Sequence, residues 1–200
     1  MLPCQEQGGL IQNIMFLTED QLSRVGLKSY GSNVLISDKC SIYGAKDIEI
    51  GNNVRIDDFC ILSGDIHIGD FVHIGCHTSL IGKGKIRIGD YAGLSGHCSI
   101  YSSSDDYSGQ HLTNPMVSDT YTNVNHKPVV LMRHALIGAN SVVLPGVCIG
   151  EGAAIGALSL VKRNIGEYEV WGGNPLRFIR QRSRNLLFME KQHRDGNRSL

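Results

Sequence analysis

The sequence has no surplus of charge of either sign and no long apolar run. Lysine plus arginine equals aspartate plus glutamate at 19 each, so the formal net charge is zero, and we expect no nucleic-acid partner held by charge. No apolar run approaches the roughly 20 residues of a membrane-spanning helix, so we expect no membrane insertion. The start, MLPCQEQGGLIQN, lacks the basic and long apolar regions of a signal peptide. These absences favour a cytoplasmic protein.

The six cysteines lack a CxxC spacing, and a chain of 200 residues is long enough to bury a core without disulfides. Three of them, Cys40, Cys60 and Cys98, occupy the same place in a repeat that runs through the chain. We therefore interpret the cysteines as small apolar fillers in a reducing compartment and not as a disulfide framework.

What the chain does contain is a six-residue period, visible in the stretch IGDFVHIGCHTSL. A helix has an apolar period near 3.6 and a strand a period of 2, so neither produces this spacing. Aliphatic residues hold the first position of the unit, and small or apolar residues follow four places on. The first positions are Ile50, Ile56, Leu62, Ile68, Ile74, Leu80, Ile88, Leu94, Ile100, Leu131, Ile137, Val143, Ile149, Ile155 and Val161.

A unit of this length suits a very short strand followed by a corner. Gly, Asn and Asp gather at the corners, as in GNN, GDF and GDY, because corners need unusual backbone angles. Self-similarity at a fixed period indicates a solenoid, in which each repeat is buried by its neighbours. We expect a triangular prism of about six parallel coils, stacked about 4.8 Å apart. A β-sandwich with coincidental spacing is the alternative; so many first positions in one register argue against it. The spacing does not determine the handedness of the coil.

Two parts near the termini break the period. In the segment 1–33, Thr18 is a suitable N-cap and Gly26 a suitable stop for a short helix that caps the first coil. The segment 166–200 contains Pro175, after which we predict a helix with an apolar stripe. The members of that stripe are Leu176, Ile179, Leu186 and Leu187.

A third break lies inside the solenoid, which we place at 34–165. The period stops after Ile100 and resumes at Leu131, which leaves the polar segment 101–128 as an insertion. A polar loop of this length on a rigid scaffold is usually functional. We therefore expect substrate-binding residues there.

The repeats IGNNVRI, IGDFVHI, IGDYAGL and IGANSVVLPGVCIGEGAAIGALSLV resemble those of the hexapeptide-repeat acyltransferases. The tail GGNPLRFIRQR is similar to the ending of the galactoside, maltose and xenobiotic acetyltransferase branch. The resemblance implies a left-handed parallel β-helix, a homotrimer and acetyl-CoA as co-substrate, bound in the groove between neighbouring prisms. Members with a segment like SIYSSSDDYSG are associated with surface polysaccharides such as O-antigen. The implied activity is acetyl transfer to a hydroxyl or amine of a sugar or nucleotide-sugar.

The resemblance also indicates where the catalytic base should lie. Where related enzymes carry a loop histidine, this chain has Asp105, with Asp106 beside it. A carboxylate with an ordinary pKa of about 3.9 is a poor base for a hydroxyl. Three readings stay open: the two carboxyls raise the pKa of one of them, His126 or His111 is the base, or the acceptor is an amine that needs less help. Turn capping by the two aspartates is the non-catalytic alternative.

The resemblance also implies a donor groove lined by Gly138, Ala139, Ala157 and Ser159. Three cations are placed to meet the donor phosphates, with ordinary solvated charges as the alternative: Lys162, Arg163 and Arg177. His134 is a further cofactor candidate because the fourth place of its unit lies on a corner, and Tyr107 and Asn114 of the insertion are candidates for contacting the sugar.

Two other functions are alternatives to acyl transfer: a metalloenzyme and a non-catalytic scaffold. His77 and His97 occupy the same place in successive coils, so we expect them to stack on one edge. The same fold class includes metal-dependent carbonic anhydrases with histidine ligands, but the polar insertion and the Gly-Asn-Pro tail argue against that class, and we expect no metal. A non-catalytic β-helix scaffold is the other alternative, and it predicts no saturable binding of acetyl-CoA.

Overall fold

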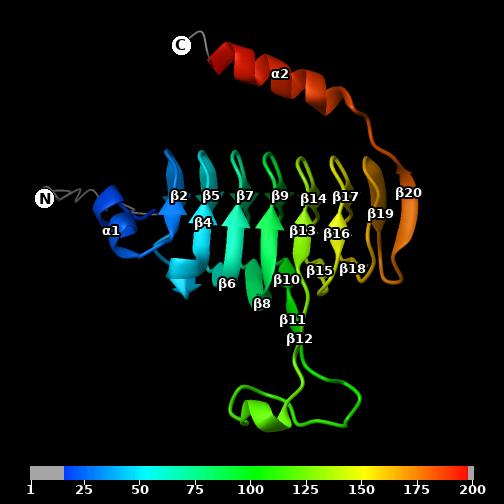
Figure 1. The fold of residues 1–200 in the computed structure, drawn as a ribbon. Coiled ribbons are helices and arrows are strands. Elements are labelled where there is room, and N and C mark those ends of the chain that lie inside the picture. Colours follow the sequence, from blue (N-terminus) through cyan, green and yellow to red (C-terminus); the bar gives the residue numbers. More distant parts are fainter. Residues whose placement is uncertain (1–15, 198–200) are drawn as a thin grey trace, which may run out of the picture.

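The computed structural model describes residues 16–197 and shows a β-solenoid of about seven turns, where the sequence predicted about six (Figure 1). The first six turns each contribute one strand to each of three faces, and the last turn adds β19 to the first face. The first face consists of seven parallel strands and ends in an antiparallel one. Its strands are β2 (Val34–Ile36), β5 (Val54–Ile56), β7 (His73–Ile74), β9 (Gly93–Leu94), β14 (Leu136–Ile137), β17 (Ala154–Ile155), β19 (Glu169–Gly172) and β20 (Arg177–Gln181).

The other two faces form a continuous sheet, because two long strands run across the corner between them. These are β6 (Ile61–Ile68) and β8 (Ser79–Ile88). The second face also holds β3 (Ser41–Tyr43), β10 (Ser99–Tyr101), β15 (Val142–Val143) and β18 (Leu160–Val161). The third also holds β1 (Ser29–Tyr30), β4 (Ile48–Ile50), β13 (Val129–Leu131) and β16 (Cys148–Ile149).

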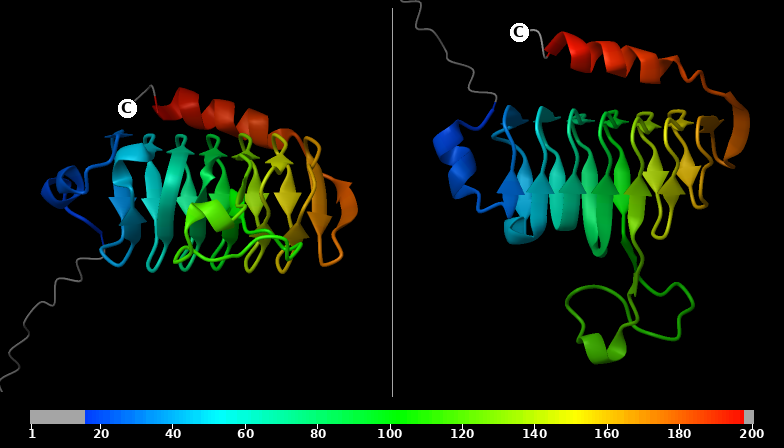
Figure 2. Two further views of the ribbon diagram at one scale, coloured as in Figure 1. Left: turned by 60° about the horizontal axis from the view of Figure 1, so that its bottom comes forward. Right: turned by 45° about the horizontal axis from the view of Figure 1, so that its top comes forward.

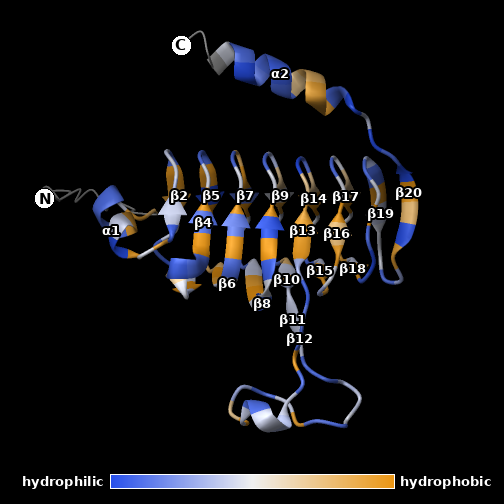
Figure 3. Ribbon diagram, in the orientation of Figure 1, coloured by the Kyte–Doolittle hydropathy of each residue, from blue (hydrophilic) through white to orange (hydrophobic). Residues whose placement is uncertain are grey.

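The predicted first-position residues form the core. On the third face, Ile50 pairs with Ile68, Ile68 with Ile88, and Ile88 with Leu131. All of them are at most 3% exposed. Figure 3 shows the contrast between apolar strands and a hydrophilic insertion. Burial of an aliphatic side chain contributes about 1.5–3 kcal/mol, so this column is the main source of the solenoid's stability.

Polar side chains link successive turns at the corner between the third and first faces, here called the helix corner. The Oδ1 atom of Asp70 accepts a hydrogen bond from the Asn52 N–H at 2.7 Å, and Asp90 does the same for the Asp70 N–H at 2.9 Å. A Cβ atom at Gly51 would collide with the Asp70 carboxylate. Glycine is therefore required where this ladder of side chains passes close to the backbone.

The N-terminal cap helix is confirmed. Helix α1 (Glu19–Arg24) begins after Thr18, whose hydroxyl accepts a hydrogen bond from the Gln21 N–H in a reciprocal capping box. The chain leaves the helix through Gly26, which has φ of +77°. Leu22 is the residue of this helix that reaches the core.

The predicted helix directly after Pro175 is wrong in its first half. Residues 177–181 form β20, which pairs antiparallel with β19 and brings Phe178 edge-on to Trp171 at 5.8 Å. The helix, α2 (Asn185–Asn197), begins only after Arg182 has donated hydrogen bonds to the carbonyls of His134 and Gly152. Strand pairing with the last turn therefore overrides the helical spacing of the apolar residues.

Helix α2 runs back along the helix corner, outside the solenoid, in all three views of Figures 1 and 2. On the opposite side of the solenoid the insertion projects as an arm. It contains the short hairpin β11 (Ser103–Ser104) and β12 (Asn125–His126) and the 3-10 helix η2 (Asp119–Tyr121). A second 3-10 helix, η1 (Ala45–Asp47), lies at the equivalent corner of an earlier turn.

Two other expectations concern the cysteines and the membrane. The thiols of Cys40, Cys60, Cys76, Cys98 and Cys148 are free, while Cys4 lies outside the described residues. Within residues 16–197, no helix is long and apolar enough to cross a bilayer.

Candidate active site

The insertion leaves the solenoid at the corner between the second and third faces, here called the insertion corner. Its two ends are held together by β11 and β12, in which Ser103 pairs with His126 and Ser104 with Asn125. Lys127 N–H then donates to the Ser102 carbonyl at 3.0 Å. The root of the arm is thus fixed by backbone hydrogen bonds to the solenoid.

A cavity of about 610 Å³ lies at this root. The solenoid supplies its floor through Ser63, Gly64, Ile81, Gly82 and Lys83, and the insertion supplies its walls. The wall residues are Ser103, Asp105, Asn114, Pro115, Asp119, Thr122, Asn123, Val124 and His126. Two carboxylates, an imidazole, hydroxyls and amides therefore converge on one space, as expected of a site for a polar ligand.

The floor of the cavity depends on two glycines. Gly64 and Gly82 face each other in adjacent strands with φ of +119° and +137°. A Cβ atom at Gly64 would collide with the Gly82 carbonyl oxygen, and one at Gly82 with the Ser102 hydroxyl. Between this glycine pair and the next paired residues, Ile66 and Ile86, strand β8 has two more residues than β6, so the register of the two strands shifts at this point.

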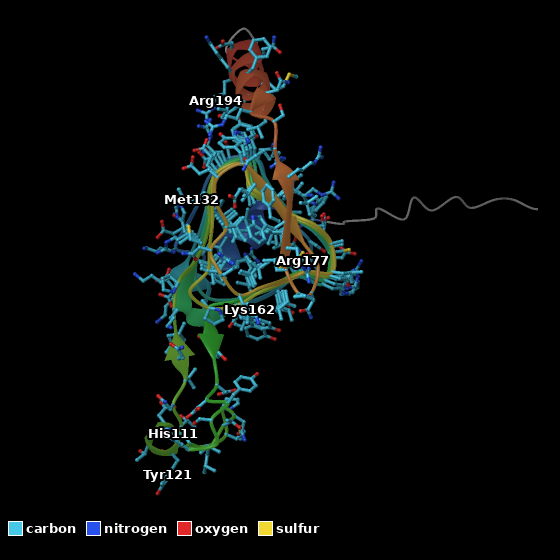
Figure 4. The ribbon with its side chains drawn as sticks, turned by 90° about the vertical axis from the view of Figure 1, so that its right-hand side faces the viewer. His111, Tyr121, Met132, Lys162, Arg177 and Arg194 are labelled. Carbon is cyan, nitrogen blue, oxygen red and sulfur yellow. The ribbon has the colours of Figure 1, made fainter. Side chains whose placement is uncertain are left out.

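Of the predicted catalytic and sugar-binding residues, Asp105, His126 and Asn114 line the cavity. Asp106 and His111 do not. They pair with each other in the arm, with 2.6 Å between Oδ2 of Asp106 and Nδ1 of His111. Figure 4 shows His111 far out on the insertion, away from the solenoid.

The pKa of the Asp106 carboxyl is lowered, whereas one reading of the sequence allowed it to be raised by the neighbouring Asp105. Hydrogen bonds from Ser108 and from His111 lower the pKa of the Asp106 carboxyl well below its usual range. The sequence argument allowed the pair of carboxyls to raise the pKa of one of them, and Asp106 is not that group. Its side chain instead closes a turn by accepting the Ser108 N–H at 2.7 Å.

Tyr107 is 93% exposed and is not among the residues that line the cavity. Sequence reasoning missed Ser103, Asp119, Thr122 and Asn123 within the cavity. The polar composition of the insertion was their only signal, since no spacing rule tells which residues of an irregular loop face inward.

The histidine at the cavity has a defined partner. The Oγ atom of Ser103 lies 2.7 Å from Nδ1 of His126, and it also accepts the Lys83 backbone N–H at 2.8 Å. The ring nitrogen of His126 that remains for the cavity is therefore Nε2.

The predicted donor-groove residues lie in the last turns. Gly138 sits so close to the next coil that a Cβ atom there would collide with Ala157 N, and the Ala139 carbonyl accepts the Leu158 N–H at 2.9 Å. Ser159 is 3% exposed, and its hydroxyl donates to the Gly156 carbonyl at 2.6 Å. Its side chain is therefore committed to holding the corner, which leaves backbone and small side chains to face a ligand.

The predicted phosphate-binding cations are exposed side chains near the C-terminal end of the solenoid. Lys162 and Arg163 lie at the insertion corner, two turns beyond the arm, and the Arg163 guanidinium stands 5.4 Å from the Trp171 ring. Arg177 begins β20. Figure 4 shows Lys162 and Arg177 against the solenoid, on the body of the molecule that also carries the arm.

His134 does not face an open groove. It is buried beneath α2, where Nε2 contacts the Glu190 carboxylate at 2.7 Å and the ring stacks on Tyr91. Arg133 and Arg194 also pair with Glu190. His134 therefore anchors the C-terminal helix, because the corner that carries it is covered by that helix.

His77 and His97 stack as predicted, with ring centroids 4.6 Å apart, and Phe59 continues the stack at 4.9 Å from His77. A zinc site needs a third ligand near such a pair. In the part of the chain that the structure describes, no three His, Cys, Asp or Glu side chains are grouped to hold a metal ion.

A solenoid of hexapeptide turns, with a cavity lined by carboxylates at the root of an inserted arm, is the architecture that the sequence analysis expected of a hexapeptide-repeat acyltransferase. Residues 128–163 match the family model described as bacterial transferase hexapeptide (six repeats). The chain is 51% identical over 178 residues to the dTDP-4-amino-4,6-dideoxy-D-glucose acyltransferase of Escherichia coli, covering 88% of this chain and 93% of that protein. It belongs to the hexapeptide-repeat acyltransferases, and it is an acyltransferase that uses acyl-CoA.

Solved structures of an N-acyltransferase have the same fold as this chain. AntD, an N-acyltransferase from Bacillus cereus, matches in complex with dTDP and 3-hydroxybutyryl-CoA at a TM-score of 0.89 and 42% identity, covering 92% of this chain and 98% of that one. A variant of AntD in complex with dTDP-4-amino-4,6-dideoxyglucose and coenzyme A matches at a TM-score of 0.88 and 42% identity, covering 91% and 98%.

Proposed function

We propose that this enzyme transfers an acyl group from acyl-CoA to the amine of a dTDP-linked 4-amino-4,6-dideoxy sugar, and that the transfer takes place in the cavity at the root of the arm. The observation that carries the proposal is that Asp105 lines this cavity while its neighbour Asp106 is engaged elsewhere. The E. coli relative is named for this acceptor, and AntD was crystallised with it.

An amine acceptor removes the difficulty that a carboxylate base raises. A neutral amine is already a nucleophile, and its nitrogen becomes strongly acidic once it has bonded to the thioester carbonyl carbon. Asp105 then accepts the proton that the nitrogen loses, while the C–S bond breaks and the CoA thiolate departs. An aspartate carboxylate is adequate for this transfer, although it would be a weak base for a hydroxyl. This favours N-acylation over O-acylation.

We propose acetyl as the transferred group, with longer acyl groups as the alternative, since AntD was crystallised with 3-hydroxybutyryl-CoA. The donor would lie along the small residues near Gly138 and Ala157, with its phosphates toward Lys162 and Arg163. A homotrimer would complete the groove from a neighbouring solenoid. The reaction would take place in the cytoplasm, and the product would serve the assembly of a surface polysaccharide such as O-antigen.

The test is a thiol-release assay with acetyl-CoA and 3-hydroxybutyryl-CoA against dTDP-4-amino-4,6-dideoxyglucose. The matched acceptor is the same nucleotide sugar with a 4-hydroxyl. We expect turnover with the amine and at least about 100-fold less with the hydroxyl. Asp105→Asn should lower kcat by about 100-fold or more, while Asp38→Asn, a matched change at an exposed aspartate outside the cavity, should not. Equal turnover of the two acceptors, or an unimpaired Asp105→Asn enzyme, would contradict the proposal.

A further inference from the structure

We propose that Ser103 holds His126 in the tautomer that carries its proton on Nε2, so that His126 is a hydrogen-bond donor to an oxygen of the bound substrates and not the general base. The inference deepens the proposed function and rests on it for the identity of the substrates. It assigns Ser103 as a positioning residue.

The pairing of the two residues is set by the backbone. Ser103 and His126 are directly opposite each other in the antiparallel pair β11–β12, at the root of the arm. Such opposed residues bring their side chains together without the help of the irregular loop beyond them. The contact of 2.7 Å between Oγ and Nδ1 is therefore a property of the hairpin.

The direction of the hydrogen bond follows from the second contact of Ser103. Its Oγ atom accepts the Lys83 backbone N–H at 2.8 Å, and a backbone N–H can only donate. The hydroxyl then has its own hydrogen to place. Among the residues that the structure describes, the acceptor within reach of that hydrogen is Nδ1 of His126. An Nδ1 that accepts carries no proton, which puts the proton of the neutral ring on Nε2.

This tautomer gives His126 and Asp105 different roles in the cavity. His126 and Asp105 both line it, but a ring that presents an N–H cannot also take a proton at that nitrogen. The carboxylate of Asp105 is acceptor-only when ionised. Asp105 then acts as the base, as proposed above, and His126 donates to an oxygen, either of the nucleotide sugar or of the thioester, where a fixed donor stabilises developing negative charge.

The direct experiment is long-range ¹⁵N–¹H correlation NMR on the full chain with ¹⁵N-labelled histidine at about pH 8.5, where an imidazole is neutral. The His126 signals are identified by their loss in His126→Gln. We expect a protonated Nε2 and an unprotonated Nδ1 in the wild-type protein, and a mixture of both tautomers in Ser103→Ala. Ser103→Thr, which keeps the hydroxyl, should restore the wild-type spectrum.

Kinetics give the second readout. His126→Gln keeps an N–H donor near the position of Nε2 but has no basic nitrogen, so it should retain activity within about tenfold, whereas His126→Ala should lose clearly more. Ser103→Ala should lower kcat/KM by about 3–10-fold, with recovery in Ser103→Thr. His67→Gln, on the third face outside the cavity, is the matched control. A raised KM for the sugar in His126→Ala assigns the oxygen to the nucleotide sugar, and a lowered kcat assigns it to the thioester.

A wild-type His126 protonated on Nδ1 would overturn the inference, and so would a His126→Gln enzyme as impaired as His126→Ala. The NMR result does not depend on turnover. A failed acyl-transfer assay with the expected tautomer would therefore contradict the proposed function alone.

Discussion

The coiled body and the inserted arm of this enzyme obey different rules. In the body, the aliphatic residues at the first position of the six-residue unit are buried and pair with their counterparts in neighbouring turns, so the same packing is repeated from turn to turn. In the arm, residues 105–124 bury little and are held by individual polar contacts, such as the one between Asp106 and His111. The comparison teaches that stability resides in the repeat and chemistry in the place where the repeat is interrupted.

The largest expected effect sharpens this comparison with one substitution made in both regions. Leu80→Ala removes a side chain that is fully buried between Leu62 and Ile100, and it should lower the free energy of unfolding by about 2–5 kcal/mol. Leu112→Ala, in the arm, changes a leucine that is 58% exposed and should cost less than about 0.5 kcal/mol. Denaturant unfolding at one protein concentration measures both. Similar losses would show that the arm is packed as tightly as the body.

The second prediction concerns the floor of the cavity, where the arm joins the solenoid. Gly82→Ala places a Cβ atom against the Ser102 hydroxyl and 2.7 Å from Ser103 N, at a φ of +137°. We expect a loss of about 1–3 kcal/mol in unfolding free energy together with reduced activity, because the root of the arm must shift. Gly109→Ala is the control: its φ is +80°, but nothing lies within 4 Å of the new atom. Normal activity in Gly82→Ala would mean that the floor does not position the site.

A third prediction concerns α2, which belongs to neither region. Burial alone would raise the pKa of Glu190, but hydrogen bonds from Arg133 and His134 outweigh it, so the pKa lies below its ordinary value of 4.5. Because the pKa is depressed in the folded state, this contribution to docking is complete above about pH 4.5 and is lost as the pH falls through the folded value. Limited proteolysis of the helix should therefore accelerate in acid while the solenoid stays folded.

The variant Glu190→Gln should show that fast proteolysis already at neutral pH. Glu167→Gln, an exposed glutamate at the same corner, is its matched control. If the proteolysis rate of the helix is the same in both variants and at both pH values, the Glu190 cluster does not hold α2.

The smallest effect is expected at the N-terminal cap. Thr18→Ala removes the side chain that accepts the Gln21 N–H, and it should cost about 1 kcal/mol. Thr18→Ser keeps the hydroxyl and should restore most of that loss. Unfolding measured by circular dichroism gives both values, and a loss confined to Thr18→Ala would confirm that α1 closes the first coil through its capping box.

The buried residues of the solenoid could be predicted one by one, because the six-residue spacing of aliphatic residues recurs along the chain. Ile50, Ile68 and Ile88 were placed in one column from spacing alone, and they pair in that register. The step of eight residues from Leu80 to Ile88, two more than the usual six, shows the irregularity in the sequence, and the structure shows it as a register shift between β6 and β8. The segment after Pro175 was harder, because its apolar residues have helical spacing, whereas residues 177–181 pair as β20 with the neighbouring strand β19, Phe178 opposite Trp171.

The sequence indicated where the candidate cavity lies, but not all of the residues that line it. The interruption of the period marked the arm, the resemblance pointed to Asp105, and His126 and Asn114 were candidates within the insertion; all three line the cavity. Asp119 and Ser103 were missed because an irregular loop has no period from which to tell inward from outward. His134 was placed on a corner correctly, but the position of α2 over that corner follows from tertiary packing.

The arm joins the body through two strands of two residues each, Ser103–Ser104 and Asn125–His126. Everything beyond this narrow neck can change in length and composition without altering a single turn below it. Replacing residues 106–124 with those of a relative, which leaves Asp105 in place, is therefore a direct route to a new acceptor specificity that leaves the coils of the solenoid unchanged.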